Sequence, residues 1–267
     1  MKPNQLFAMC LGFAILSSLA ACKQQPAPVT NPPAVETSLA STALALAKQT
    51  EAANPITVTP SPTSTETLTP TPRISTGGTS LEIREDGSTL FTDHKLGYQL
   101  MVPAEWIVIR INEDEYYKAF TVEEIAANPP MVDFLSKIQT QDSNQVRMFA
   151  LDLRATIGSI SGIFVVLQPP TIETMDDWVV ARISGGNKKP GYILHSSGYQ
   201  EIPAGVRAMV RDEQWNSTSS EKIYSRTIAF SIPAGILTID VETALDNKDT
   251  LLSDFEQVMN SLTLFEP

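Results

Sequence analysis

The clearest pattern of hydrophobic and polar positions lies in the last third of the chain, where the two kinds of residue alternate. One such run extends from Val206 to Arg211 and another from Leu237 to Glu242. A period of two is typical of strands, so we expect strands over 192–202, 205–215, 222–232 and 235–243. The tetrapeptide Ile-Pro-Ala-Gly follows two of them, at 202–205 and 232–235, where proline and glycine favour tight turns. The pattern predicts an antiparallel meander with one face buried and the other in water.

Further strands are expected earlier in the chain. Residues 88–91 and 98–102 predict a hairpin that turns at 94–97, and a strand follows over 106–111. Another strand is expected over 146–153. The unbroken apolar run Ile163–Leu167 lies between a glycine and a proline, which suits a central strand covered on both faces.

Helical periodicity predicts two short helices between the early and middle strands. Thr121 and Glu124 have the spacing of a capping box, and Pro129 ends the helix that they start. Apolar residues over 131–138 recur at helical spacing and form one stripe.

Two longer helices follow. Thr174 and Asp177 repeat the capping-box spacing, and the helix after them has a buried stripe from Met175 to Ile183. The last helix, over 248–260, has the best amphipathic stripe in the chain, and a short strand over 262–265 follows it. Helices interspersed with antiparallel strands predict an α+β domain in which the helices pack on an antiparallel sheet.

The start and end of this domain resemble a known group of proteins. The segment Leu96-Gly97-Tyr98-Gln99-Leu100-Met101-Val102-Pro103, followed by Ala104-Glu105-Trp106, resembles the Gly-Tyr … Pro … Trp opening of the PsbP-like and DcrB-like families. The closing helix with Asn260–Phe265 is similar to their last helix and strand. The resemblance implies an α/β/α sandwich over 81–267 and an accessory or partner-binding role. It departs from the families over 112–141 and in the long middle, and it transfers no binding residue.

The first 22 residues predict a lipoprotein signal peptide. The apolar run from Leu6 to Leu19 is shorter than the about 20 residues that cross a bilayer. It ends in Leu19-Ala20-Ala21-Cys22, which resembles the bacterial lipobox. The resemblance implies that a signal peptidase recognises Leu19, Ala20 and Ala21, and that Cys22 becomes an N-terminus carrying diacylglycerol and a further acyl chain such as palmitate. The alternative is an ordinary secretory signal with an accidental cysteine.

The segment 23–80 has the composition of a tether. Proline, threonine, alanine and serine dominate it and aromatic residues are absent, so we expect it to stay disordered. Residues 36–53 could form a nascent helix, and the threonine-rich pieces could carry sugar. The domain organisation is thus a signal peptide over 1–22, a tether over 23–80 and one globular domain over 81–267.

Charge and cysteine content exclude several classes of function. The formal net charge is −11, which disfavours nucleic acid because phosphate backbones are bound by concentrated Lys and Arg. The alternative use of that charge is a surface for cations or for a basic partner. Both cysteines, Cys10 and Cys22, precede the domain, so the domain can hold no disulfide and no cysteine-based metal site.

The domain also shows no recognisable catalytic set. His94 and His195 fall in unrelated elements, and the stretch Gly158–Gly162 has Ile160 where a nucleophile elbow needs serine. Acidic runs at 113–115, 123–124 and 176–177 fit charges at helix starts better than a metal site. The aromatic residues Trp106, Tyr116 and Tyr117 either line a groove or belong to the core.

These observations favour a membrane-anchored, extracytoplasmic lipoprotein whose domain binds a protein or cell-envelope partner and is not an enzyme. The expected membrane is the cell membrane, or an outer membrane where the source has one. We expect no catalytic residue, cofactor or metal, and membrane lipid as a partner only through Cys22. The first alternative is a lipoprotein that binds a small ligand or solute, and the second is a carboxylate-dependent hydrolase.

Overall fold

The computed structural model of the protein describes residues 73–217 and 220–267. The expected signal peptide, the lipobox Leu19–Cys22 and the tether up to residue 72 lie outside the described residues. The first described strand begins at Thr79, close to residue 81, where the globular domain is expected to start.

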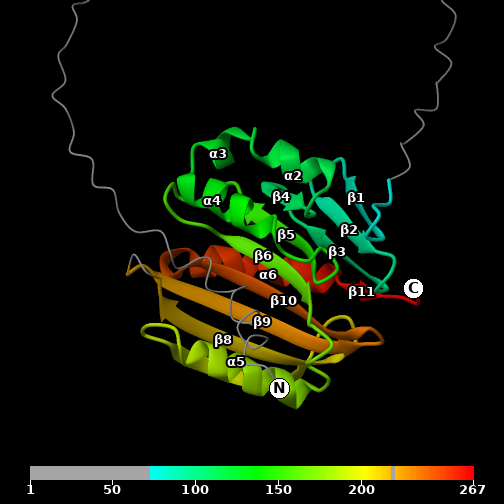
Figure 1. The fold of residues 1–267 in the computed structure, drawn as a ribbon, viewed down its shortest axis with the longest axis vertical. Helices are drawn as coiled ribbons and strands as arrows, with labels where there is room; N and C mark the ends of the chain where they lie inside the picture. Colours follow the sequence, from blue (N-terminus) through cyan, green and yellow to red (C-terminus); the bar gives the residue numbers. More distant parts are fainter. Residues whose placement is uncertain (1–72, 218–219) are drawn as a thin grey trace, which may run out of the picture. The chain divides into compact units, whose positions relative to one another are not determined.

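The described strands form two sheets in which all neighbours pair antiparallel (Figure 1). The smaller sheet has the order β1-β2-β3-β11, and the larger sheet has the order β4-β5-β6-β10-β9-β8-β7. The strands are β1 Thr79–Ile83, β2 Thr89–Asp93, β3 Tyr98–Val102, β4 Trp106–Ile109, β5 Val146–Asp152, β6 Gly162–Leu167, β7 Ile193–Glu201, β8 Arg207–Asn216, β9 Lys222–Ile232, β10 Gly235–Ala244 and β11 Thr263–Leu264.

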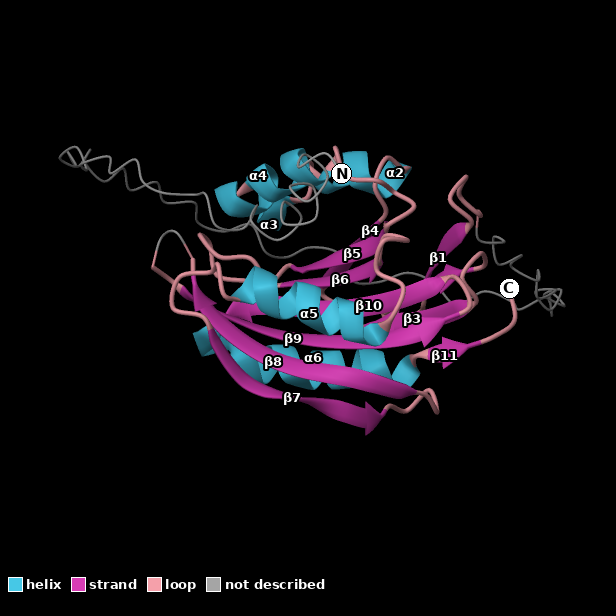
Figure 2. Ribbon diagram, turned by 60° about the horizontal axis from the view of Figure 1, so that its bottom comes forward, coloured by secondary structure: helices cyan, strands magenta, loops and turns pink. Residues whose placement is uncertain are grey.

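Helices cover both faces of the larger sheet. Figure 2 shows α5 and α6 on opposite sides of β8 and β9. Phe164 packs under α2–α4, whereas Asp240 contacts α5, and these two residues are directly paired on β6 and β10. Because directly paired residues point to the same face, α2–α4 and α5 share one face. The helices are α2 Asp114–Ala119, α3 Glu123–Ala126, α4 Pro129–Ile138, α5 Met175–Gly186 and α6 Lys248–Ser261, and the 3₁₀ helix η2 is Leu245–Asn247.

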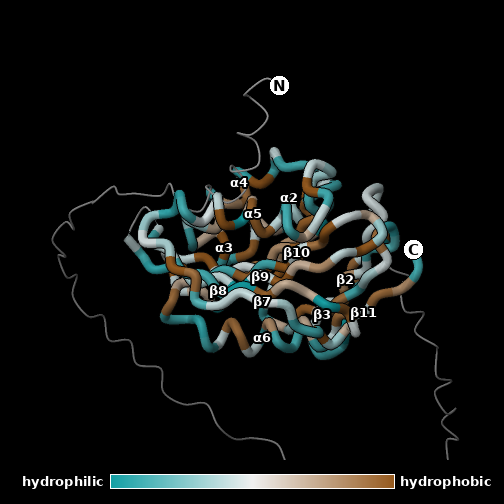
Figure 3. Tube along the Cα trace, turned by 90° about the horizontal axis from the view of Figure 1, so that it is seen from below, coloured by the Kyte–Doolittle hydropathy of each residue, from teal (hydrophilic) through white to brown (hydrophobic). Residues whose placement is uncertain are grey.

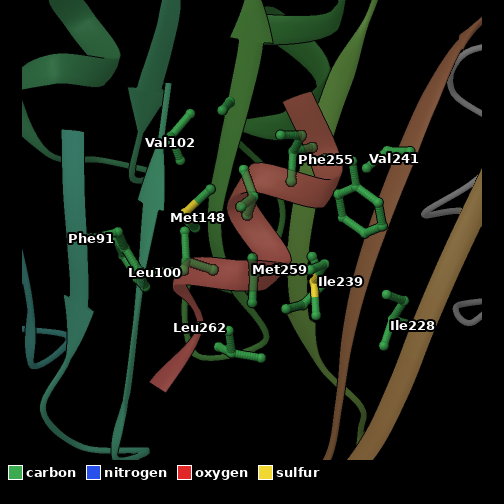
Figure 4. Packing of buried hydrophobic residues seen from close by; sticks show 14 of the residues in the cluster. Phe91, Leu100, Val102, Met148, Ile228, Ile239, Val241, Phe255, Met259 and Leu262 are labelled. Atoms are coloured by element: carbon green, nitrogen blue, oxygen red, sulfur yellow. The ribbon is translucent and has the colours of Figure 1, made fainter. Parts of the chain in front are cut away.

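The largest hydrophobic core lies between the larger sheet, the smaller sheet and α6. Figure 4 shows α6, with Phe255 and Met259, between Leu100 and Val102 of β3 on one side and Ile239 and Val241 of β10 on the other. The brown and teal stretches that follow one another along α6 in Figure 3 reflect its expected amphipathic stripe. This stripe lets α6 bury its apolar side in the core and keep its polar side in water.

A buried ion pair also joins the two sheets. The carboxylate of Asp93, at the end of β2, accepts a hydrogen bond of 2.6 Å from Nε of Arg147 on β5. The guanidinium of Arg147 further donates to the carbonyl of Gly77, and Asp93 accepts the backbone N–H groups of Lys95 and Leu96. Both charges are therefore hydrogen-bonded as buried charges require.

The expected α+β class with antiparallel strands and packed helices is confirmed, and the strands fall into two sheets. The chain leaves the smaller sheet for the larger one between β3 and β4, where Glu105 has a left-handed φ of 71°. The central position of β6 is confirmed, because Ile163 and Val165 face one core and Phe164 faces another.

The prediction that one face of the meander is buried and the other in water is wrong. Over β8–β10 the second face is not in water, because α5 covers it, and Arg211 and Glu242 are only 1% and 3% exposed. All nine residues of β7 are exposed, so this strand lacks the expected buried face. The buried stripe of α5 also differs from the expected one. Ile183 is 39% exposed, and the side chain of Arg182 points to the sheet instead.

The two expected capping boxes have different outcomes. At α5 the box is confirmed, since the Thr174 hydroxyl accepts the N–H of Asp177 and the Asp177 carboxylate accepts the N–H of Thr174. At α3 it is wrong: the N-cap is Val122, and the Thr121 hydroxyl donates to the carbonyl of Lys118.

Candidate functional site

A groove of about 560 Å³ lies between the outer edges of β1 and β4. Its floor is apolar and includes Leu81 and Ile83 of β1 and Trp106, Ile107 and Val108 of β4. Among the described strands, β1 pairs only with β2 and β4 pairs only with β5. The groove is therefore bounded by two strand edges, each of which has main-chain groups without a partner strand among the described residues.

The hydrogen bonds between β1 and β2 show which residues of β1 direct their main-chain N–H and C=O groups toward the groove. The N–H of Arg84 donates to the carbonyl of Ser88, and the N–H of His94 donates to that of Gly78. In an antiparallel ladder bonded and non-bonded positions alternate, so the even-numbered residues bond to β2. The N–H and C=O groups of Leu81 and Ile83 point outward, toward the groove.

The same reasoning applies to β4. The N–H of Leu153 donates to the carbonyl of Glu105, so the odd-numbered residues of β4 bond to β5. The main-chain groups of Trp106 and Val108 point to the other side, into the groove. Its opposite walls thus carry two rows of main-chain donors and acceptors that no strand within residues 73–217 and 220–267 uses.

The side chain of Arg110 lies at one end of the groove. Its guanidinium donates to the carbonyl of Thr79 at 2.8 Å, which occupies the first outward acceptor of β1. It also pairs with Glu115 of α2, through a hydrogen bond of 3.2 Å to one oxygen and a shorter one to the other. Further along the rim Arg73 lies 3.9 Å from Asp114. These rim charges are paired with each other, so they do not converge on the floor.

A second feature is a charged layer buried between α5 and the larger sheet. We use this name for Arg182, Lys189, Arg211, Glu213, Asp240 and Glu242. Arg182 donates to the Asp240 carboxylate at 3.1 Å and lies 3.5 Å from that of Glu213. Arg211 donates to Glu213 at 2.9 Å. Three cations and three anions compensate one another, as buried charges must.

Glu242 is the least satisfied member of the charged layer. Among the described residues, no donor hydrogen-bonds to either of its carboxylate oxygens, and Ser225, its neighbour on β9, has an unpaired hydroxyl. Burial raises the pKa of Glu242 to about 7, and Lys189 and Arg182 offset this only in part. Burial also lowers the pKa of Lys189 to about 8, and its ammonium lies 3.2 Å from the ring centre of Trp215. The charged layer thus holds α5 on the sheet at an electrostatic cost.

The residues singled out from the sequence are scattered over the domain. His94 bonds to Ser80 in the smaller sheet, and His195 contacts Gln214 on the exposed side of the larger one. Of the three aromatic candidates, Trp106 is buried in the largest core and also borders the groove, Tyr116 is buried in the core under α2–α4, and Tyr117 is exposed outside the groove.

The acidic runs have structural explanations. Glu115 pairs with Arg110, Asp177 caps α5, and Glu123 and Glu124 lie in the first turn of α3. Within residues 73–217 and 220–267 no group of His, Cys, Asp and Glu side chains is arranged to hold a metal ion. The helices in those same ranges are too short or too polar to span a membrane.

The sequence reasoning missed the charged layer, and of the groove it named only Trp106, as one of three aromatic residues that either line a groove or belong to the core. The layer had a visible signal, because Arg182 lies four residues after Trp178 on the buried stripe of α5 and faces strands with charges at alternate positions. The position of the groove had no signal in the sequence, because it depends on which strand edges have no partner strand among the described residues.

Comparison with protein families and with curated proteins finds no match. Comparison with solved structures finds similar folds. One is the cyanobacterial PsbP protein CyanoP from Synechocystis sp. PCC 6803, with 16% identity, a TM-score of 0.44, and coverage of 68% of this chain and 95% of that one. Another is LpqN of Mycobacterium tuberculosis, described as involved in cell envelope biogenesis, with 11% identity, a TM-score of 0.42, and coverage of 67% and 91%. The structural neighbours of this chain thus include a PsbP-like protein and a protein involved in cell envelope biogenesis.

Proposed function

We propose that the chain is a membrane-anchored, extracytoplasmic lipoprotein whose domain binds an extended segment of a protein partner in the groove between β1 and β4. The observation that carries this proposal is the pair of unused strand edges. The outward main-chain groups of Leu81, Ile83, Trp106 and Val108 can form hydrogen bonds with another extended chain. The proposed membrane location rests on the lipobox-like sequence Leu19-Ala20-Ala21-Cys22, in which Cys22 would carry the lipid.

The shape of the groove suits this occupant. Strand addition takes its affinity from main-chain hydrogen bonds and its specificity from alternate side chains. The apolar floor would receive those side chains, and Ile83, which is 78% exposed, would be covered. The charged rim, with Arg73, Lys118 and Asp114, would select among partners more than it would add affinity.

The groove volume also falls in the range of small-ligand sites. Such sites place a few free polar groups around the ligand, whereas Arg110 and Glu115 already bind each other here. A carboxylate-dependent hydrolase needs two carboxyl groups flanking one bond. Glu213 and Asp240, which both approach Arg182, are buried under α5 and engaged with arginine.

The proposal is tested by blocking the edge of β1 without breaking the sheet. Proline at position 83 removes an outward N–H and leaves the β1–β2 hydrogen bonds in place, so Ile83→Pro should abolish partner binding in a folded protein. Partner binding is measured in cells that produce the full chain with a photoreactive residue at Asp114, on the rim of the groove. We expect a crosslinked adduct of one defined mass.

The matched control is Ser197→Pro, which makes the same kind of change at the edge of β7 and should leave the adduct intact. A photoreactive residue at Tyr117, outside the groove, should give none. An adduct at Asp114 that survives Ile83→Pro would show that the groove edge does not bind the partner.

A further inference from the structure

Strand β7 is a long edge of the larger sheet that nothing in the described part of the chain covers. It pairs only with β8, and all nine of its residues are exposed. It contains no proline or lysine, which are the residues that most often protect an edge from pairing. A bulge between Leu194 and Ser196 protects its start, so the regular edge is Ser196–Glu201.

The hydrogen bonds between β7 and β8 identify the outward groups of this edge. The N–H of Ile202 donates to the carbonyl of Val206, so the even-numbered residues of the regular part bond to β8. The N–H and C=O groups of Ser197, Tyr199 and Glu201 therefore point away from the sheet.

A second copy of β7 fits these groups in one antiparallel register. Centred on Gly198, the register places Ser197 of each copy opposite Tyr199 of the other, so that outward groups meet outward groups. Gly198 then faces Gly198 at the dyad, where a non-hydrogen-bonded pair brings the backbones closest. A Cβ at Gly198 would have no atom of the same chain within 4 Å. No atom of its own copy therefore obstructs the approach of a second copy at this position.

The charges of the strand permit this arrangement. Glu201 is the one charged residue of β7, and the register places it opposite position 195 and not opposite the other Glu201. Ser196 faces Gln200, a pair of polar side chains that can hydrogen-bond. The net charge of −11 opposes self-association at long range, but salt screens exposed charges beyond about 8 Å.

From these observations we infer that two copies of this chain associate through β7, as an isologous dimer whose larger sheets form one continuous sheet across a dyad at Gly198. This contact is distinct from the groove between β1 and β4, which stays open on each copy.

The test uses the absence of cysteine from the domain. Opposite residues of a non-hydrogen-bonded pair have Cα atoms about 4.5 Å apart, within the about 4.4–6.8 Å that a disulfide spans. Membranes from cells that produce the full chain are oxidised with copper phenanthroline and run on a non-reducing gel. Gly198→Cys should convert the main monomer band into a covalent dimer, whereas the wild-type chain and Ser136→Cys, on the exposed side of α4, should stay monomeric.

Adding Ser197→Pro to Gly198→Cys removes an outward N–H of the register and should suppress the covalent dimer. Tyr199→Pro is the second variant for the same purpose, and circular dichroism confirms that each is folded. Sedimentation of the detergent-solubilised wild-type chain should give the mass of a dimer, and the proline variants that of a monomer.

Three results would overturn the inference. One is a Gly198→Cys band no stronger than that of Ser136→Cys, and another is a covalent dimer that persists with both proline substitutions. The third is a disulfide adduct with the mass of a different protein, which would make β7 the site of another partner.

Discussion

At the scale of single residues, Gly97 shows how strictly some positions of this fold are determined. It has a φ of 72° in the turn between β2 and β3, and a Cβ there would lie 2.2 Å from the carbonyl oxygen of Phe265. The N–H of Phe265 in turn donates to the carbonyl of Gly97. The turn thus depends on a residue without a side chain for both its conformation and its contact with the chain end.

Gly97→Ala should therefore lower the free energy of unfolding by roughly 2 kcal/mol, because strain and a clash are added together. Chemical denaturation measures the change. Gly185→Ala is the matched control: this glycine lies in α5 with open space around it, and alanine there should stabilise the protein by up to about 1 kcal/mol. Equal effects of the two substitutions would contradict this account.

Residue-level predictions from the sequence succeeded where the determinant was local. The capping box of Thr174 and Asp177 starts a helix of 12 residues. The Thr174 hydroxyl therefore has a regular first helical turn whose N–H groups it can accept. Thr121 has the same spacing to Glu124, but the helix that follows has only four residues. There the preceding turn at Lys118 offers the hydroxyl a better acceptor.

At the scale of elements, α5 is held on the sheet by few apolar side chains and by the charged layer. Its buried residues are Trp178 and Gly186, and Arg182 supplies the ionic contacts. The ionised form of Glu242 is disfavoured by burial, so the attachment of this element depends on pH.

The sign of that dependence follows from the two pKa values. Between about pH 4.5 and 7 the folded chain keeps a proton on Glu242 that the unfolded chain has lost, so the free energy of unfolding falls as the pH rises through this window. Between about pH 8 and 10.5 the unfolded chain keeps a proton that Lys189 loses on folding, so stability rises with pH there.

Glu242→Gln should remove the first slope. The wild-type chain loses stability from this group between pH 5 and 7, by no more than about 3 kcal/mol, and the variant should lose none of it. Urea unfolding at pH 5, 6, 7 and 8 measures the difference between the two proteins at each pH, so effects of other groups cancel. A difference that does not change with pH would show that Glu242 does not titrate in this range.

The sequence predicted the strands of the meander but not that their polar face is buried. Arg211, Glu213, Asp240 and Glu242 occupy alternate positions, which normally indicates contact with water. They are buried because a helix from elsewhere in the chain brings Arg182 to them. That compensation involves three separate elements, and the periodicity of any one of them does not show it.

At the scale of the whole molecule, the proposed function joins an anchor to a binding domain. Cys22→Ala should move the protein from the membrane fraction to the soluble fraction or leave it as an uncleaved precursor, because in the proposed function a thioether-linked lipid and a further acyl chain on Cys22 would provide the attachment. Fractionation and immunoblotting measure this. Cys10→Ala is the matched control and should leave the distribution unchanged, since that residue is expected to be removed with the signal peptide.

The layered α+β architecture was predictable from the sequence, whereas the arrangement of the strands was not. Alternation and turn residues indicate strands and hairpins, and hairpins pair neighbours such as β9 with β10. The pairing of β11 with β3 joins residues about 160 positions apart, as the bond from Met101 to Ser261 shows. The groove exists because one edge of β1 and one edge of β4 have no partner strand among the described residues, which only this long-range arrangement determines.

The late position of α6 and β11 in the chain affects when the protein can fold during synthesis. The main core combines Phe91 with residues as late as Leu262, so it cannot close before almost the whole chain has left the ribosome. A nascent chain that ends before Lys248 lacks the helix that fills this core. The main core therefore closes only when synthesis is nearly complete, whereas the core under α2–α4, which uses residues 107–166, has all of its residues much earlier.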